Sequence, residues 1–370
     1  MNPQQAPRGA QAEADWLRLI RSENVGPATF WGLLKRHGSA AAALEALPEI
    51  ASRAGLKRPI VRATADEVTR ERARAERLGV GYLFLGAPGY PERLARIHAP
   101  PPVITVRGDT AVLSRAPLGV VGARKASAAG CTLSARFAEA FGAAGRTVVS
   151  GLALGIDAAA HRAALPFGTV AVVAGGVDRP TPEEHIALAD EIIASGGAVV
   201  SEMPLGFNPR ARDYPRRNRL IAGLSDGVVV IEAAHNSGSL HTARYAADEN
   251  RELFAVPGSP LDPRAAGCLQ LLQSGAGMAV TARDVLDGVA RWDPPEPRFP
   301  GFADDADQPL PPAAMERVAA SLSLTPVTAD DLIRQTGLSA GAVMAALVEL
   351  QVAGRAEEDV DGTVRAISPA

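Results

Sequence analysis

An arginine cluster occupies ten positions near the middle of the chain, although the formal net charge of all 370 residues is only -3. Guanidinium groups bind phosphate oxygens through paired N–H donors, and a tyrosine within the cluster offers a ring on which a base can stack. This composition favours a nucleic-acid strand as the ligand, and a solvated charged turn is the alternative. The residues concerned are Arg210, Arg212, Tyr214, Arg216, Arg217, Asn218 and Arg219.

The cluster runs directly into Leu220-Ile-Ala-Gly-Leu-Ser225, an apolar stretch typical of a helix. The arginines are therefore expected near a helix start. Free backbone N–H groups and the helix dipole favour an anion at such a place.

A second candidate phosphate loop follows a short apolar run at 118–121. Gly122 permits a tight turn, Arg124 and Lys125 supply positive charge, and Ser127 can cap the next helix. The loop is not a Walker motif, because Ala126 follows the lysine and the glycine spacing differs. An ordinary turn from strand to helix remains an alternative.

The segment Ser150-Gly151-Leu-Ala-Leu-Gly-Ile-Asp157-Ala-Ala-Ala-His161 follows the next apolar run. Asp157 and His161 are four residues apart, so they share one face of a helix and resemble a catalytic dyad. We favour a structural role, in which Asp157 accepts backbone N–H groups at the helix start and His161 bonds locally. No catalytic residue is therefore assigned.

A third loop combines small hydroxyl residues with glycine at the start of a further helix. Such a sequence forms a cradle of amides and hydroxyls for an anion. Together with the arginine cluster, the three loops predict one phosphate-lined groove without a metal or other cofactor. The residues of this third loop are Ser237, Gly238, Ser239 and Thr242.

These loops are attached to alternating β-branched runs and helical stretches. Near-continuous apolar strands separated by helices are typical of a buried parallel sheet, whose strand-end loops meet along one edge. The sequence predicts an extended Rossmann-like, doubly wound α/β domain over residues 81–290. Its expected strands are 82–85, 103–106, 118–121, 147–149, 169–173, 198–200, 227–231 and 253–256.

Two smaller units flank this core. Residues 1–80 are expected to be all-helical; Asn24-Val-Gly-Pro27 resembles a helix-hairpin-helix turn, as in a SAM-like domain, or is plain helix punctuation. A proline-rich linker is expected at 291–312. Residues 313–370 read as three helices (314–322, 329–335 and 340–352) and a β-wing with strands near 354–355 and 360–364, a winged helix-turn-helix.

Composition places the chain among globular proteins, with 47% hydrophobic and 21% charged residues. Two cysteines, Cys131 and Cys268, are too few for a disulfide framework, and no stretch has the roughly 20 apolar residues of a membrane span. We expect a cytoplasmic protein. Because the middle of the chain has no overall basic excess, a polyanion site there must be local.

Several motifs in order resemble the DNA-processing protein A (DprA/Smf) family over residues 80–290. They are Gly122-Ala-Arg124, Ser150-Gly-Leu-Ala-Leu-Gly-Ile-Asp157, Ser201-Glu-Met-Pro204, Tyr214-Pro-Arg-Arg-Asn-Arg-Leu-Ile-Ala-Gly-Leu-Ser225, Ser237-Gly-Ser-Leu-His-Thr-Ala243 and Val256-Pro-Gly258. Two motifs depart from the family: its Gly-Ser-Arg is Gly-Ala-Arg here, and its Asp-x-x-Tyr-Pro-x-x-Asn is Asp178-Arg-Pro-Thr-Pro-Glu-Glu-His185.

The resemblance implies a homodimeric, single-stranded DNA-binding protein that is not an enzyme. Family members protect incoming strands during natural transformation and load the RecA recombinase onto them. The family's DNA pocket maps onto seven positions of this chain: Arg124, Ser150, Gly151, Tyr214, Arg217, Asn218 and Arg219.

Two other functions are compatible with parts of the sequence. The core is also similar to Rossmann nucleotide phosphoribohydrolases of the lysine-decarboxylase-like family, but Tyr245 stands where their loop carries the carboxylate needed at the breaking bond. A duplex-binding regulator acting through the winged helix is opposed by four basic against eight acidic residues in 311–370. The expected recognition helix, 340–352, also offers no base-reading side chain before Gln351. We therefore favour a packing or protein-contact role for this domain.

Overall fold

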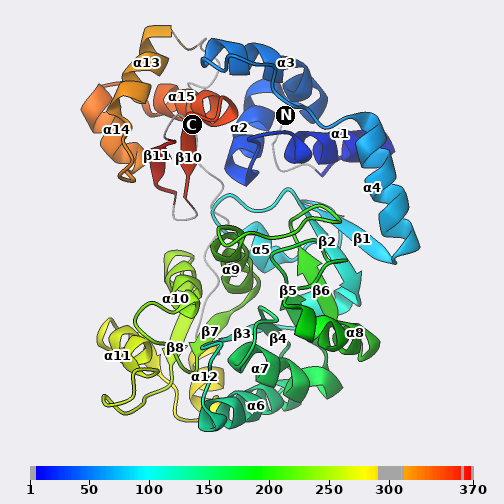
Figure 1. Cartoon of the computed structure of the whole chain (residues 1–370), viewed down its shortest axis with the longest axis vertical. Coiled ribbons are helices and arrows are strands. Elements are labelled where there is room, and N and C mark those ends of the chain that lie inside the picture. Colours follow the sequence, from blue (N-terminus) through cyan, green and yellow to red (C-terminus); the bar gives the residue numbers. More distant parts are fainter. Residues whose placement is uncertain (1–5, 291–309, 311, 360–361, 368–370) are drawn as a thin grey trace.

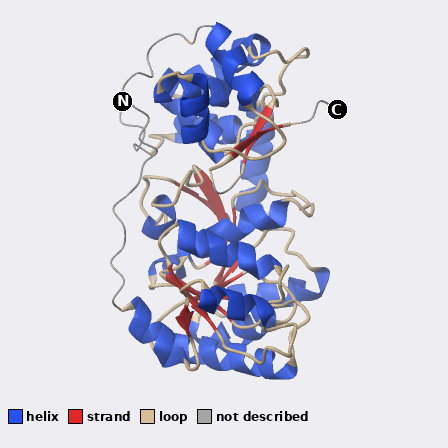
Figure 2. Ribbon diagram, turned by 90° about the vertical axis from the view of Figure 1, so that its left-hand side faces the viewer, coloured by secondary structure: helices blue, strands red, loops and turns tan. Residues whose placement is uncertain are grey.

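The computed structural model describes residues 6–290, 310, 312–359 and 362–367. Nearly all of the predicted linker at 291–312 lies outside these residues. The described chain forms a helical group beside a larger α/β core, and the winged-helix elements lie against the helical group (Figures 1 and 2). The proposed domain boundaries stay predictions.

The N-terminal helices pack around three aromatic rings. Trp16 meets Phe30 and Trp31 edge-on, with ring centroids 5.1 and 5.5 Å apart. Helix starts are satisfied locally: the Ser39 hydroxyl accepts an N–H at the start of the third helix, and Thr64 forms a capping box with Glu67 at the fourth. The helices are α1 (Ala10–Arg21), α2 (Pro27–His37), α3 (Ala40–Arg53) and α4 (Ala65–Arg77).

The core is built on one sheet in the order β1-β2-β6-β5-β4-β3-β7-β8-β9. Seven strands, from β6 to β9 in this order, are parallel, and β1 and β2 add antiparallel pairs at one edge. The strands are β1 (Val80–Phe84), β2 (Val103–Gly108), β3 (Leu118–Val121), β4 (Val148–Ser150), β5 (Thr169–Val172), β6 (Ala198–Ser201), β7 (Gly227–Val230), β8 (Glu252–Ala255) and β9 (Gly277–Met278).

Helices cover both faces of this sheet because successive strand residues point to opposite sides. Val120 and Val148 pack with the helices of one face, whereas Val121 and Val149 pack with those of the other. The first face carries α6 (Ala128–Ala143), α7 (Ile156–Ala164), α8 (Ile186–Ala194) and α12 (Ala282–Val289). The second carries α5 (Glu92–Ala95), α9 (Asp213–Leu224), α10 (Gly238–Asp248) and α11 (Ala266–Gln273).

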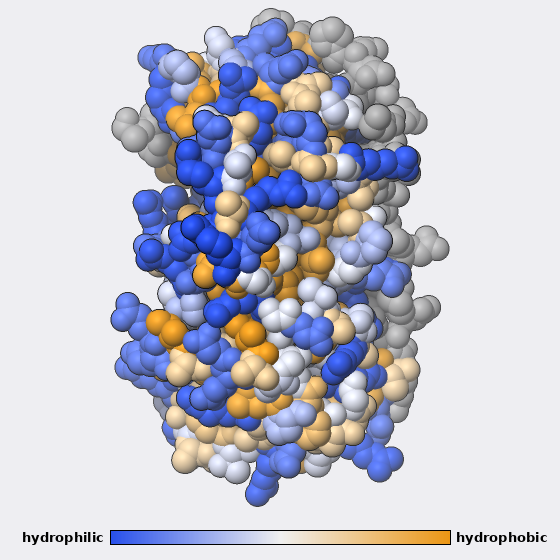
Figure 3. Space-filling view, turned by 90° about the vertical axis from the view of Figure 1, so that its right-hand side faces the viewer, coloured by the Kyte–Doolittle hydropathy of each residue, from blue (hydrophilic) through white to orange (hydrophobic). Residues whose placement is uncertain are grey.

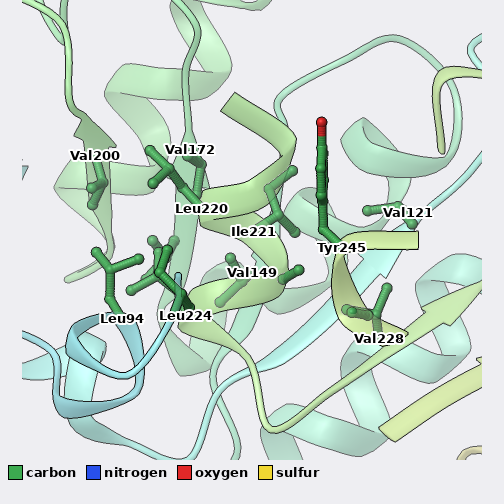
Figure 4. Close-up of a cluster of buried hydrophobic side chains, with 14 of the residues drawn as sticks. Leu94, Val121, Val149, Val172, Val200, Leu220, Ile221, Leu224, Val228 and Tyr245 are labelled. Carbon is green, nitrogen blue, oxygen red and sulfur yellow. The ribbon is translucent and has the colours of Figure 1, made fainter. Parts of the chain in front are cut away.

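Helix α9, which contains the arginine cluster, is anchored by its apolar side. Figure 4 shows Leu220, Ile221 and Leu224 of this helix lying over strand valines of the sheet. These three side chains are at most 1% exposed. The anchoring fixes the polar residues of the first turns of α9 at the carboxyl edge of the sheet.

The sheet has a switch point between β3 and β7. The connection after β3 leads to α6 on one face, and the connection after the adjacent β7 leads to α10 on the other. Such a divergence opens a crevice at the carboxyl ends of the two strands, where open α/β sheets bind ligands. The extended Rossmann-like fold predicted from the sequence is confirmed.

The C-terminal elements form the predicted winged helix. They are α13 (Pro312–Ser321), α14 (Ala329–Thr336), α15 (Ala340–Val352), β10 (Ala356–Glu358) and β11 (Val364–Ala366). The wing differs from the prediction: its strands are at 356–358 and 364–366, not near 354–355 and 360–364. Residues 360 and 361 lie outside the described part of the chain.

Helix α15 packs against the N-terminal helices. Its Val348 and Val352 join the apolar core that α1, α2 and α3 form. Glu349, which is fully buried, lies 2.6 Å from the Arg36 guanidinium and 2.7 Å from that of Arg53. Helix α15 contacts α2 and α3, so part of its surface is covered within the protein. The packing or protein-contact role favoured for this domain stays a prediction.

The surface over α4 is dominated by hydrophilic side chains, with apolar ones scattered between them (Figure 3). Among the described residues, no helix is long and apolar enough to cross a membrane.

Candidate nucleic-acid groove

A groove of about 680 Å³ opens at the switch point of the sheet. Its walls come from the loop after β3, the loop after β7, the first turns of α9 and α10, and the segment before α11. Ten residues predicted as DNA contacts line it: Gly122, Arg124, Lys125, Tyr214, Arg217, Asn218, Ser237, Gly238, Ser239 and Thr242. The structure therefore brings parts of all three predicted anion-binding segments together with the arginine cluster.

Positive charge available to a ligand comes from the loop after β3. Arg124 and Lys125 are exposed, and neither forms an ion pair with another described residue. The Arg124 guanidinium carbon lies 5.2 Å from the centroid of the Tyr214 ring, which holds the cation over an aromatic face. This pair offers a phosphate contact and a stacking platform at one place.

The start of α10 forms the opposite wall. Ser237 is its N-cap residue, and the hydroxyls of Ser237 and Ser239 are 2.8 Å apart. Asn218 of α9 donates its amide to the backbone oxygen of Gly238 at 3.1 Å, which fixes this wall relative to the arginine cluster. The helix start presents backbone N–H groups that favour an anion.

The start of α6 already holds an anion supplied by the chain. Both the backbone N–H and the hydroxyl of Ser127 donate to the Glu232 carboxylate, and the same hydroxyl accepts the N–H of Gly130 at 2.9 Å. The predicted capping role of Ser127 is confirmed. Because Glu232 neutralises this helix start, α10 is the helix start available to a phosphate.

Arg217 holds the floor of the groove together. Its guanidinium donates to the backbone oxygens of Gly151 and Val172, at the ends of β4 and β5, and the side chain is 5% exposed. A methyl group on Gly151 would collide with this buried guanidinium, so the glycine permits the close approach. Burial lowers the pKa of Arg217 to about 10, which leaves it charged at neutral pH.

Arg216 and Arg219 share one carboxylate. Arg216 donates to Glu202 at 2.7 Å, Arg219 donates to the other carboxylate oxygen, and Arg219 also reaches the backbone oxygen of Ala99 at 3.2 Å. Burial alone would raise the pKa of Glu202, but the two guanidinium groups outweigh it and lower that pKa below its usual range. Glu202 therefore cancels one of the two positive charges and fixes both side chains.

Five predicted site residues do not line the groove: Ser150, Gly151, Arg212, Arg216 and Arg219. Ser150 is fully buried, and its hydroxyl donates to the backbone oxygen of Val120 at 2.6 Å. Arg212 is exposed just before α9. Arginine density in the sequence located the right helix, but not the side chains that face the groove.

The apparent dyad of Asp157 and His161 has the structural role expected. Asp157 accepts the backbone N–H groups of Gly151 and Ala153 at 3.1 and 3.3 Å. His161 is fully buried with Nδ1 2.9 Å from the Thr169 hydroxyl, and burial lowers the pKa of His161 to about 3. A neutral, enclosed imidazole is not accessible to a substrate.

The sequence prediction missed several groove residues, including Asp157, His235, His241 and Arg264. His235 follows β7, and Arg264 follows β8 in the segment that leads to α11. Their positions after neighbouring parallel strands were a usable signal, because such strand ends meet at one edge. Arg264 is paired with Asp262 at 2.8 Å, so it adds less free charge than Arg124.

The position that distinguishes the nucleotide hydrolases lies in the core. Tyr245 is 8% exposed and belongs to the apolar cluster under α9 (Figure 4). The groove wall formed by α10 thus provides hydroxyls and amides, without a carboxylate at that place. In the part of the chain that the structure describes, no three metal-ligating side chains are grouped.

Three family models match the chain. Residues 81–290 match the model of DNA recombination-mediator protein A, residues 10–73 match a DprA-like N-terminal HHH domain, and residues 303–362 match a DprA winged helix domain. The first of these alone covers more than half of the chain.

Relatives from distant bacteria agree with these matches. Protein Smf of Escherichia coli K12 is 38% identical over 272 residues, which cover 72% of each chain. DNA processing protein DprA of Bacillus subtilis is 38% identical over 212 residues, covering 56% of this chain and 71% of the relative.

Solved structures show the same architecture. DNA processing protein A from Streptococcus pneumoniae superposes with a TM-score of 0.62 at 31% identity, covering 77% of this chain and 99% of that one. DNA processing protein A from Helicobacter pylori, whose structure was described for its single-stranded DNA binding mode, gives a TM-score of 0.52 at 27% identity. The match to the Helicobacter structure covers 57% of this chain and 95% of that chain.

Proposed function

The chain belongs to the DNA recombination-mediator protein A (DprA/Smf) family, and from this premise we propose that its groove holds single-stranded DNA. The bound strand is protected during natural transformation and passed to the RecA recombinase. The proposal gives the protein a binding role and no catalytic step.

The observation that carries the proposal is the pair of unpaired cations at the groove mouth. Arg124 and Lys125 face the start of α10 across the groove, so phosphates can be held from two sides. Phosphate contacts supply most of the affinity of proteins for nucleic acids. The buried arginines of α9 support the floor, and the loop after β3 binds the strand.

The aromatic platform favours single strands over duplexes. A base can lie against the Arg124 and Tyr214 pair only when its face is free of neighbouring bases. In a duplex these faces are stacked, so the same groove would contact only the backbone. We therefore expect a preference for single strands together with a strong dependence on salt.

A homodimer is the assembly we propose, with its contact at the β9 edge of the sheet. Met278 in β9 and Val280, two residues after it, are 59 and 60% exposed. Exposed apolar side chains beside an edge strand fit a second copy of the same chain. Sedimentation of a Met278→Asp variant should show monomer where the unmodified chain shows dimer; a monomeric unmodified chain would disprove the dimer.

The first test is fluorescence anisotropy with a labelled oligo-dT and a matched duplex over a salt series. We expect single-strand binding that weakens steeply with salt and that Arg124→Glu reduces at least about tenfold, because one phosphate contact becomes a repulsion. Arg115→Glu is the matched control. It changes the same charge on an exposed arginine at the amino end of β3, at the opposite edge of the sheet.

Equal losses in the two variants would show that the effect is one of net charge and would remove the groove from the proposal. Release of free base from a nucleoside monophosphate would instead support the hydrolase alternative.

Recombinase loading is tested separately, as the rate at which RecA assembles on a single strand coated with the unmodified chain or with the Arg124→Glu variant. An unchanged rate in the variant would contradict a role for the bound strand in loading.

A further inference from the structure

The groove contains a carboxylate, which a site built only for phosphates would exclude. Asp157 is the acidic residue among the described residues that line it. Its side chain is 5% exposed and lies in the first turn of α7. A carboxylate repels a phosphate, so the part of the ligand that faces Asp157 must be a hydrogen-bond donor.

The hydrogen bonds of Asp157 leave part of its acceptor capacity unused. The backbone N–H groups of Gly151 and Ala153 both donate to the same oxygen, Oδ2. No described backbone N–H donates to Oδ1, and the nearby Ser150 hydroxyl gives its hydrogen to Val120. Burial raises the pKa of Asp157, whereas the nearby Arg217 and the hydrogen bonds of the loop act to lower it. In its ionised form the carboxylate has about four acceptor positions, of which about two remain.

A second acceptor belongs to the same groove. Asn218 is 9% exposed, and its Nδ2 donates to the backbone oxygen of Gly238. That bond assigns the orientation of the amide, so its Oδ1 is directed away from Gly238. Asp157 and Asn218 thus offer hydrogen-bond acceptors in the interior, beside the buried Arg217 guanidinium, whereas Arg124, Lys125 and the amides of α10 can bind anions.

This division orients a nucleotide in the groove. The phosphate belongs with the cations of the loop after β3 and with the start of α10, and the base edge belongs with Asp157. Single-stranded nucleic acids are read on the Watson–Crick edges of their exposed bases. Among the four DNA bases, guanine presents two N–H donors side by side on that edge, at N1 and N2.

We propose that Asp157 gives the groove a base preference, with guanine bound best and thymine least well. The proposal rests on the strand-binding function proposed above and adds selectivity to it. Asp157 acts by direct contact with the base, in addition to its bonds to the loop after β4.

The test uses the full chain and short oligonucleotides of equal length that differ in one central base: guanine, inosine, adenine, cytosine or thymine. Anisotropy competition against labelled oligo-dT gives their relative affinities. We expect guanine to bind about tenfold more tightly than thymine, the lower range for a bidentate contact. Inosine, which lacks only the N2 amino group, should fall between them.

The variant Asp157→Asn distinguishes base recognition by Asp157 from its structural role in the loop after β4. Asparagine keeps an oxygen for the two loop N–H groups but presents an amide N–H₂, so the ratio of guanine to thymine affinity should fall to about one or below. A purely structural role would lower all affinities equally and leave the ratio unchanged. Asp262→Asn, which removes a carboxylate that does not line the groove and pairs with Arg264, is the control and should keep the ratio.

Equal affinities of the unmodified chain for guanine, inosine and thymine would overturn the inference, and this measurement needs no variant. That result would leave strand binding intact. If the proposed strand-binding function were itself wrong, none of the oligonucleotides would bind, so the two outcomes can be told apart.

Discussion

Two buried glutamates in different parts of the molecule are each held between two arginines. Glu202 lies beneath the groove with Arg216 and Arg219, and Glu349 lies where the winged helix meets the N-terminal helices, with Arg36 and Arg53. The two glutamate side chains are 5 and 1% exposed.

The two sites differ in how far their arginine side chains are exposed to solvent. The Arg219 side chain is only 8% exposed, whereas those of Arg36 and Arg53 are 23 and 33% exposed. If the glutamate is removed, the second pair can recover water, but Arg219 cannot. A glutamate between two arginines is therefore part of the core beneath the groove. The corresponding group at Glu349 is a contact that can be lost without unfolding the core.

Glu202→Ala should have the largest effect on stability. It leaves the buried Arg219 without a counter-charge, which costs about 3–5 kcal/mol in the free energy of unfolding. Denaturant unfolding followed by circular dichroism measures the loss. Glu139→Ala, on the exposed side of α6, should change the free energy by less than about 0.5 kcal/mol, and a similar small change for Glu202→Ala would remove the distinction between the two regions.

Glu349→Ala should cost less, about 1–2 kcal/mol, because Arg36 and Arg53 lose a charge-assisted partner but can be hydrated. The loss should appear as increased hydrogen exchange in α15 and α2, with the core sheet unchanged. Glu357→Ala on the wing, half exposed, is the control. Increased exchange throughout the sheet would show that this contact is not separable.

Acid should weaken both regions. Although burial acts to raise each pKa, the arginines lower the pKa of Glu202 and of Glu349 below the ordinary value. A lowered pKa stabilises the fold above about pH 4.5 and loses that contribution as the pH falls through the folded value. In Glu349→Gln, the protection factor of α15, which corrects for the intrinsic pH dependence of amide exchange, should no longer respond to this pH change, and a full remaining response would assign it to other groups.

The smallest effect is expected at His98, which joins the wing to the core. Its Nε2 lies 3.2 Å from Glu358, and that hydrogen bond raises the pKa of His98 above its ordinary value. The contribution is complete below about pH 6.5 and is lost as the pH rises through the folded pKa. The protection factor of β10, which corrects for the intrinsic pH dependence of amide exchange, should therefore decrease modestly toward alkaline pH, and His98→Gln should abolish this decrease; an unaltered decrease in the variant would exclude His98.

The strands of the sheet could be predicted because they are buried on both faces. Runs such as 227–231 are almost wholly apolar, and their ends differ from the predicted limits by one or two residues. Strand β9 was not predicted, since Gly277 and Met278 carry no β-branched pattern and depend on β8 for pairing. The switch point follows from the strand order, which no local pattern contains.

The structure brings ten of the predicted contact residues to one groove, but it pairs two of the predicted arginines with a carboxylate outside the groove lining. Charge counted along the sequence identified α9, yet Glu202, which pairs with Arg216 and Arg219, lies in another segment, at the end of β6. Whether a guanidinium is free depends on such long-range partners. Glu349 is one of the eight acidic residues counted against a DNA-binding role of the winged helix, and the structure places it in the contact with the N-terminal helices.

The contact between Gly151 and Arg217 couples two positions that are 66 residues apart in the sequence, so that a substitution at one restricts the residues allowed at the other. Any side chain at 151 would collide with the guanidinium, and any shorter residue at 217 leaves two strand-end carbonyls unpaired. A library that randomises both positions together should therefore return glycine wherever it returns arginine. Larger residues at 151 should survive only alongside smaller ones at 217, so neither position can be interpreted from a single-site scan.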